Sequence, residues 1–247
     1  MKQTITVLSL IMLTYLCCSN VSAGISPKEI LAHADRARGN VRGIEWTIHM
    51  ESIEGDRKQE SDLIVKARGN NSLAEYIAPP KSKGQKILMI DRNMWFVKPG
   101  LSKPVPISPR QKLMGGAANG DIASTNYAGD YEAVSVTEEP VNGEPCYVLD
   151  LKATNKKTTY DRIRYWVSKK RMVGVKADFF TKSGRLFKSA VFEYGNTIIS
   201  EGAPIPFVSK MIITDAVMKD HVTTMTYGKV SLKKIPDSDF NLNLIRR

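Results

Sequence analysis

Alternating apolar and polar residues are the dominant pattern of this 247-residue chain after its first forty positions. In residues 44–51 every second side chain is apolar, from Ile44 through Trp46 to Met50, and those between are polar. Neighbouring side chains of a β-strand point to opposite faces, so this period of two predicts a half-buried strand. Further strands are predicted at 62–67, 73–78, 85–90, 94–98, 131–137, 146–151, 161–167, 173–180, 186–194, 207–214 and 222–230.

Short strands at hairpin spacing predict a mainly β fold, built on a single large antiparallel sheet that curls to bury its apolar face. The segment from Ser108 to Tyr127 is too long for an ordinary hairpin loop. Pro109 can start a helix there, and glycines such as Gly115 and Gly120 would interrupt it. We expect one or two short helices that lie across the concave face as a plug or lid.

One short amphipathic helix is predicted near the start of the domain. Ser26, Pro27 and Glu29 have the order of a helix amino terminus, with a capping serine, a proline in the first turn and a glutamate at the third position. Gly39 is expected to end this helix. The apolar residues between them fall on one face: Ile30, Leu31, Ala34 and Ala37.

The amino-terminal residues resemble an export signal. Lys2 precedes an apolar run at 5–16, which is too short to span a bilayer, and Val21 and Ala23 are the small residues that signal peptidase requires. We expect residues 1–23 to be a signal peptide that is cleaved after Ala23, and residues 24–247 to be one exported, soluble domain. Cys17 and Cys18 leave open a lipid anchor, and a retained signal anchor is another alternative, although neither cysteine follows a small residue.

Composition narrows the class of partner. The chain has 36 Lys and Arg against 25 Asp and Glu, a formal net charge of +11. Such a surface attracts anionic headgroups, acidic proteins or nucleic acid. The sequence contains no recognisable nucleic-acid-binding module, so we do not expect nucleic acid as a partner. The basic residues are scattered, so they fit solvated loops better than a dedicated anion site, which stays an alternative. Cys146 is the only cysteine after the signal, so the domain has no internal disulfide and depends on burial for stability.

No catalytic or metal-binding constellation is recognisable. His33, His49 and His221 are far apart and lack partners at metal-ligand spacing. Cys146 fits a small packed residue better than a nucleophile. Asp121 and Asp130 flank Tyr127 in the predicted lid, where capping or turn roles are favoured over a catalytic carboxylate pair. We therefore predict no metal, no cofactor and no enzymatic activity, with a hydrolase as a distant alternative.

Aromatic and thioether side chains form the candidate binding surface. Such a mixture can adapt to long, variable apolar ligands, although a closed core would use the same residue types. Each methylene removed from water contributes about 0.8 kcal/mol, so one acyl chain could supply roughly 10 kcal/mol before binding costs. The candidate cavity or lid residues are Trp46, Met50, Met89, Trp95, Phe96, Leu113, Met114, Ile122, Tyr127, Trp166, Phe179 and Phe192.

A family resemblance is carried by residues 79–108, and then by positions spread over nearly all of the remaining chain. Two prolines, a Lys-Gly pair, an apolar strand, a tryptophan and an Ile-Ser pair follow one another there: Pro79, Pro80, Lys83, Gly84, Ile87, Leu88, Trp95, Pro99, Ile107 and Ser108. This arrangement resembles the outer-membrane lipoprotein-sorting family, the LolA-like periplasmic carriers. Residues 115–121 depart from the commoner family pattern, which leaves the lid and the cargo open.

The resemblance implies an incomplete β-barrel of the LolA/LolB type with a helical lid and an apolar cavity. It implies a periplasmic carrier, a monomer, that binds acyl chains of lipoproteins or free lipid and moves them toward the outer membrane. An inner-membrane transporter and an outer-membrane acceptor would be its partners. The alternative is a sensor or scaffold module that binds a protein with the same fold, as the family's sigma-factor regulators do. An open cavity favours carriage, and a filled core with an exposed apolar edge favours protein binding.

Overall fold

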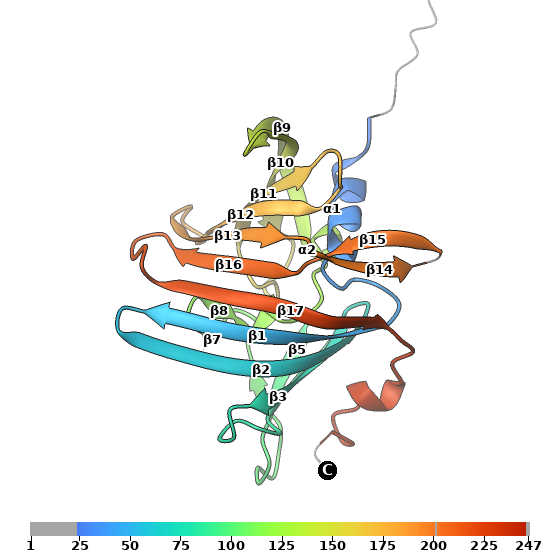
Figure 1. Cartoon of the computed structure of the whole chain (residues 1–247), viewed down its shortest axis with the longest axis vertical. Coiled ribbons are helices and arrows are strands. Elements are labelled where there is room, and N and C mark those ends of the chain that lie inside the picture. Colours follow the sequence, from blue (N-terminus) through green and yellow to red (C-terminus); the bar gives the residue numbers. More distant parts are fainter. Residues whose placement is uncertain (1–23, 201, 246–247) are drawn as a thin grey trace, which may run out of the picture.

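A 13-stranded antiparallel sheet makes up most of the computed structural model, which describes residues 24–200 and 202–245 (Figure 1). The predicted signal peptide, with its cleavage site and both of its cysteines, lies outside the described residues. The strands of this sheet are β1 (Ile44–Glu54), β2 (Arg57–Arg68), β3 (Asn71–Ala78), β4 (Lys86–Ile90), β5 (Asn93–Val97), β6 (Val105–Ile107), β9 (Tyr131–Val141), β10 (Glu144–Ala153), β11 (Arg162–Ser168), β12 (Gly174–Phe180), β13 (Leu186–Glu193), β16 (Lys210–Asp215) and β17 (Val222–Leu232).

The sheet is open, because its edge strands β6 and β9 do not pair with each other. Its order is β6-β5-β4-β3-β2-β1-β17-β16-β13-β12-β11-β10-β9. The amino-terminal wing, β1 to β6, therefore meets the carboxy-terminal wing, β9 to β17, at the β1–β17 ladder, which pairs Ile44 with Leu232 at one end and Ile53 with Val222 at the other. Two small hairpins lie outside this sheet: β7 (Lys112–Met114) with β8 (Ala117–Ala118), and β14 (Asn196–Ser200) with β15 (Ala203–Phe207).

Helical structure is limited, as the sequence predicts. In α1 (Pro27–Arg36) the Ser26 hydroxyl accepts a bond from the Glu29 amide at 3.3 Å, and the Glu29 carboxylate accepts one from the Ser26 amide at 2.9 Å. This reciprocal cap confirms the predicted helix start. The remaining helical pieces are single turns: α2 (Tyr127–Asp130) and the 3-10 turns η1 (Asn119–Asp121) and η2 (Asp237–Phe240). No helix within the described ranges is both long and apolar enough to cross a membrane.

All twelve predicted strands overlap observed ones. Strand β2 begins earlier than predicted because residues 57–60 are exposed and polar, and they extend the β1–β2 hairpin beyond the core. The β14–β15 hairpin was not predicted. Pro204 and Pro206 lie in β15, and proline lacks the N–H that a strand interior requires, so the sequence argues against a strand there. The strand forms because β15 pairs with β14 alone and its other edge needs no ladder hydrogen bonds.

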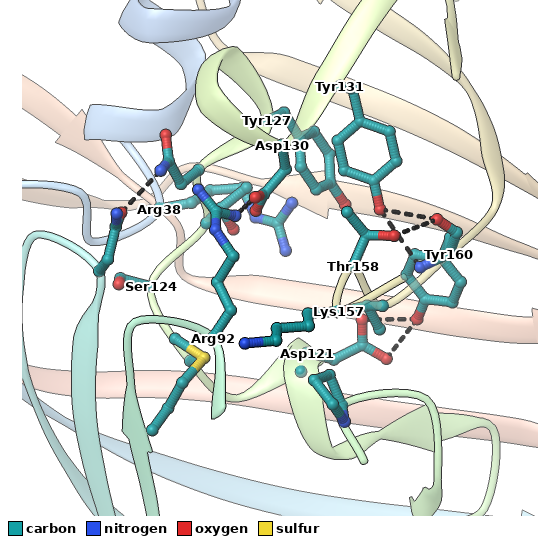
Figure 2. Close-up of a pocket in the computed structure, with 18 residues that line it drawn as sticks. Arg38, Arg92, Asp121, Ser124, Tyr127, Asp130, Tyr131, Lys157, Thr158 and Tyr160 are labelled. Atoms are coloured by element: carbon teal, nitrogen blue, oxygen red, sulfur yellow. Dashed lines mark hydrogen bonds and ion pairs between the residues drawn. The ribbon is translucent and has the colours of Figure 1, made fainter. Parts of the chain in front are cut away.

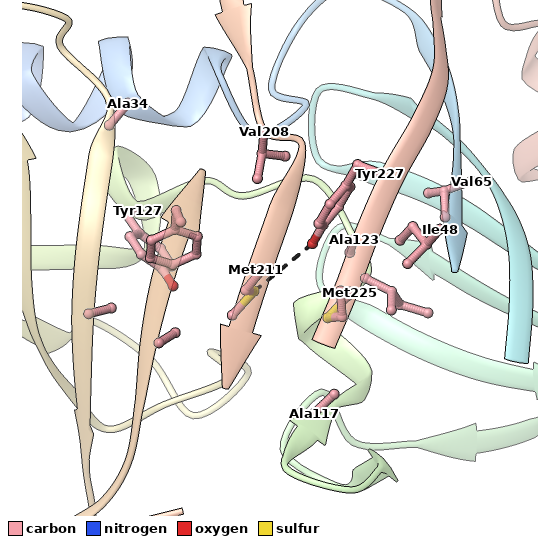
Figure 3. Close-up of a cluster of buried hydrophobic side chains, with 14 of the residues drawn as sticks. Ala34, Ile48, Val65, Ala117, Ala123, Tyr127, Val208, Met211, Met225 and Tyr227 are labelled. Atoms are coloured by element: carbon pink, nitrogen blue, oxygen red, sulfur yellow. Dashed lines mark hydrogen bonds between the residues drawn. The ribbon is translucent and has the colours of Figure 1, made fainter. Parts of the chain in front are cut away.

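The concave face of the sheet is covered by a packed core. Figure 3 shows members of this cluster that come from different elements, with Met225 and Tyr227 on β17, Ala34 on α1 and Ala117 on β8. Tyr227 donates its hydroxyl to the Met211 sulfur at 4.0 Å. The core is therefore shared between the sheet, the first helix and the segment that follows β6.

Two smaller clusters lie apart from this core. In one, buried Cys146, which is a free thiol, packs with Val148 and Trp166. In the other, the carboxy-terminal segment lays Ile235, Phe240 and Ile245 against strands β3 to β5. Parts of the sheet are consequently covered on both faces.

Candidate ligand-binding site

Residues 108–130, here called the crossing segment, run across the concave face from the β6 edge to the β9 edge. β7 and β8 lie behind β1 and β17 in Figure 1. At Gly115 the segment approaches so closely that a Cβ would collide with the hydroxyls of Ser52 and Thr223, and the Gly116 amide donates to the Thr223 hydroxyl at 2.8 Å. The segment occupies the place predicted for a lid, but it is a short hairpin with single helical turns rather than the predicted one or two helices.

A buried ion pair attaches the crossing segment to β13. The Lys188 ammonium lies 3.2 Å from an Asp121 carboxylate oxygen and donates to the Gly116 carbonyl at 2.6 Å. Tyr160 donates its hydroxyl to the same carboxylate at 2.6 Å. Burial, with Asp121 beside it, raises the pKa of Tyr160 well above its ordinary value, so the phenol stays protonated and can donate. Asp121 also accepts from the Ala118 amide, which is the predicted capping role, but its ion pair was not foreseen.

An apolar cleft of about 390 Å³ opens between the crossing segment and strands β12 and β13. This volume falls in the range of roughly 300–1,000 Å³ that is usual for small-molecule pockets. Its apolar wall consists of Ala117, Ala118, Tyr160, Phe180 and Phe187. Arg110, Lys112 and Lys188 bring positive charge to it. Asp161 and Asp215 line it as well. The cleft is thus an apolar space whose lining carries three basic and two acidic side chains, next to the Lys188–Asp121 pair.

A second, polar cavity of about 40 Å³ lies between the crossing segment, Arg38 just after α1, Arg92 and the loop at 157–160 (Figure 2). Arg38 is buried there, with its guanidinium 4.6 Å from the Phe192 ring centre, and its Nη1 has no hydrogen-bond partner among the described residues. Arg92 pairs with Asp130 across the cavity. The space suits a few water-sized molecules and is too small for an acyl chain.

Asp35 lies on the α1 side of this region. It accepts a hydrogen bond from the Ala128 amide at 2.9 Å, while its second carboxylate oxygen has no partner in the described part of the chain. Burial raises the pKa of Asp35 to about 6. The α1–α2 junction therefore contains a carboxyl group that titrates in the mildly acidic range.

The structure distributes the predicted ligand residues over several places. Seven belong to the concave core: Trp46, Met50, Met89, Ile122, Tyr127, Phe179 and Phe192. Phe96, Leu113 and Met114 are half-buried against it. Trp166 packs with Cys146, and Trp95 with the carboxy-terminal cluster. None of the twelve lines the apolar cleft, so their part in binding stays a prediction.

None of the residues that line the cleft is among the ligand-binding residues predicted from the sequence. Phe180 is the last residue of β12, and Phe187 is the second residue of β13. An aromatic residue in a predicted strand is normally interpreted as part of the hydrophobic core. The useful signal would have been the pair of glycines Gly115 and Gly116, which allow the crossing segment to approach the sheet. No group of three His, Cys, Asp or Glu side chains is placed to hold a metal ion within residues 24–200 and 202–245.

Comparisons with known proteins agree with this architecture. A family model described as "-like: Uncharacterized protein" matches residues 68–247. No curated protein sequence matches the chain. A putative outer membrane lipoprotein-sorting protein domain from Vibrio parahaemolyticus shares 20% identity over 88% of this chain and 97% of its own, with a TM-score of 0.75. A DUF1329 family protein from Desulfovibrio piger, also 20% identical over 88% and 97%, has a TM-score of 0.74. Both likenesses concern the fold.

A stronger match is the crystal structure of a LolA superfamily protein from Nitrosomonas europaea. It is 30% identical, over 89% of this chain and 99% of the relative, with a TM-score of 0.79. The curled open sheet, the covering segment and the resemblance at residues 79–108 point the same way. The chain therefore belongs to the LolA superfamily.

Proposed function

We propose that this protein is a periplasmic carrier that binds an acyl chain of a lipoprotein or of a free lipid and moves it toward the outer membrane. The observation that supports it is the apolar cleft of about 390 Å³ between the crossing segment and strands β12 and β13. Phe180 and Phe187 would contact the chain on one side, and Ala117 and Ala118 on the other. An inner-membrane transporter as donor, an outer-membrane acceptor and a monomeric carrier belong to the same proposal.

Loading and release would use the crossing segment as a lid. Its strands β7 and β8 pair only with each other, so the segment can move without breaking a ladder of the main sheet. Ala117 and Ile122 belong to the concave core, and lifting the segment would extend the cleft toward that apolar surface. Ten methylenes removed from water contribute about 8 kcal/mol, from which the cost of binding and of moving the lid is subtracted. The net binding free energy that is left can be small, because a carrier must also release its cargo.

A titration with a fluorescent fatty acid tests this function. Phe187→Gln places an amide in the cleft wall, and we expect at least tenfold weaker binding because the amide loses its hydration to the hydrocarbon. Val191→Gln is the matched control, since Val191 lies on the same strand but is 45% exposed and outside the cleft. Its affinity should stay within twofold of the parent. Thermal melts establish that both variants are folded, and equal affinities in the two would overturn the cleft as the binding site.

A second candidate function is protein binding by a sensor or scaffold module. It is favoured by the filled concave core and by the edge strand β9, where Val134 and Val136 are 54% and 41% exposed. An open strand edge can pair with an extended segment of a partner. A folded protein that binds no fatty acid, and from which no lipid is extracted for mass spectrometry, would favour this second function over the carrier.

A further inference from the structure

A basic groove adjoins the apolar cleft. It has a volume of about 830 Å³ and lies between the end of β10, the following loop, the start of β11 and the β12–β13 turn. Its charged lining consists of Arg110, Lys152, Lys156, Arg162 and Lys182, against one carboxylate, Asp161.

The groove and the cleft share Arg110 and Asp161, which line both. The Arg110 guanidinium lies 2.7 Å from an Asp161 carboxylate oxygen, and its Nε donates to the Thr158 carbonyl at 2.9 Å. Arg110 is therefore held in place at the boundary. A molecule that extends past it would leave apolar surroundings and enter basic ones.

The charge of the groove is not cancelled locally. Asp161 is paired with Arg110, and none of Lys152, Lys156, Arg162 and Lys182 forms an ion pair with a carboxylate in the described ranges. Positive charges gathered in a concave surface raise the local concentration of anions more than the same charges on a flat one. Guanidinium groups also bind phosphate and carboxylate through two parallel hydrogen bonds.

We propose that the basic groove binds the anionic headgroup of the amphiphile whose acyl chain occupies the apolar cleft. This inference rests on the proposed carrier function and narrows its cargo. An uncharged acylglyceryl group, such as that on a lipidated protein, offers the groove nothing to bind, whereas a phospholipid or lysophospholipid has a phosphate next to its acyl chain. The favoured cargo class is a free anionic lipid.

The test compares two amphiphiles with the same twelve-carbon chain, lauroyl lysophosphatidic acid and monolauroylglycerol, by calorimetric titration below their micelle concentrations. The parent protein should bind the phosphate form at least tenfold more tightly. Lys156→Glu/Lys182→Glu changes the charged lining from five basic and one acidic side chains to three of each. This variant should lose the preference while its affinity for monolauroylglycerol stays within twofold, because neither residue lines the cleft.

The control variant Lys81→Glu/Lys103→Glu makes the same change in net charge at exposed residues of the amino-terminal wing. This control variant should keep the preference for the phosphate amphiphile. If it loses that preference, the effect is one of overall charge, and the assignment of the headgroup to the basic groove is overturned. Equal affinity of the parent for both amphiphiles would also overturn the inference but leave the carrier intact. Failure of both to bind the parent would overturn the carrier function and this inference with it. Inorganic phosphate that binds as tightly as the phosphate amphiphile would overturn the assignment to a lipid headgroup.

Discussion

Lys188 and Asp121 form the most buried ion pair of the described residues, with side chains only 5% and 3% exposed. The pair connects β13 to the crossing segment, and Lys188 also donates to the Gly116 carbonyl of that segment. Removing two charges from water is costly, and their attraction repays the cost only when the remaining donors and acceptors are satisfied. Tyr160 and the Ala118 amide supply the further hydrogen bonds on Asp121.

Removing one partner of this pair should be strongly destabilising. Lys188→Met leaves the Asp121 carboxylate buried without its cation, and we expect a loss of about 3–5 kcal/mol in the free energy of unfolding. The double variant Lys188→Met/Asp121→Asn should recover most of that loss, because no uncompensated charge remains. Urea denaturation of the single and double variants measures both. A control at the surface pair of Lys210 and Glu193, Lys210→Met, should change little. Equal effects at the two lysines would contradict a role for burial.

The close approach at Gly115 can be tested by adding one methyl group. Gly115 and Gly55 both have positive φ angles, of 53° and 60°, so alanine strains the backbone similarly at either position. Only at Gly115 would the new Cβ collide with Ser52 and Thr223, since nothing lies within 4 Å at Gly55. Gly115→Ala should therefore lower the free energy of unfolding by about 1–3 kcal/mol more than Gly55→Ala. Similar melting temperatures for the two variants would show that the crossing segment can shift freely.

The raised pKa of Asp35 predicts a particular pH dependence. Its carboxyl binds a proton more tightly in the folded protein, with a pKa of about 6, than in the unfolded chain, where the ordinary pKa is 3.8. The corresponding stabilisation is fully present below about pH 4 and is lost as the pH rises through 6. Asp35→Asn has no such titration, so the stability of this variant relative to the parent should rise by about 2 kcal/mol between pH 4 and pH 7. Denaturant titrations over that range check it, and a constant difference would contradict the buried state of Asp35.

The carboxy-terminal cluster should be an integral part of the domain. Phe240 is buried against strands β3 and β4, with the Arg68 guanidinium 5.3 Å from its ring centre. Phe240→Ala should cost about 3–5 kcal/mol, as is usual for a truncated core aromatic residue. Val217→Ala, at a residue that is 82% exposed, should be nearly neutral. A similar small effect at both positions would mean that the segment beyond residue 235 contributes little to stability.

Strands such as β1 were predictable because one face packs on a core and the other is more polar. In β1 the buried positions include Ile44, Trp46, Ile48 and Met50, as the alternation predicted. The same logic fails in β4 and β5, where both faces carry apolar side chains. Leu88 packs under the carboxy-terminal segment, while Ile87 and Met89 face the concave core. The sequence pattern of these strands does not indicate which sheet face each side chain occupies. For this reason it does not predict that Trp95 packs on the outer face with the carboxy-terminal cluster.

The crossing segment was placed correctly and its conformation was not. Its length excludes an ordinary hairpin loop, and local propensity predicts that its glycines interrupt a helix. In the structure Gly115 and Gly116 are the points where the backbone approaches β1 and β17. Such an approach depends on partners more than 60 residues away in sequence, such as Ser52 and Thr223, and local propensity does not report them. The cleft that results could not be located for the same reason.

Separation of the β7–β8 hairpin from the main sheet has a consequence for hydrogen exchange. Amides in the β1–β17 ladder lose their partners only when the two wings come apart, which amounts to global unfolding. Amides of residues 112–118 exchange after the release of a hairpin with strands of three and two residues, together with its bonds to Thr223, Lys188 and Glu54. The molecule should therefore contain two exchange regimes, and a ligand in the cleft would slow the faster one while leaving the exchange of the ladder controlled by global stability.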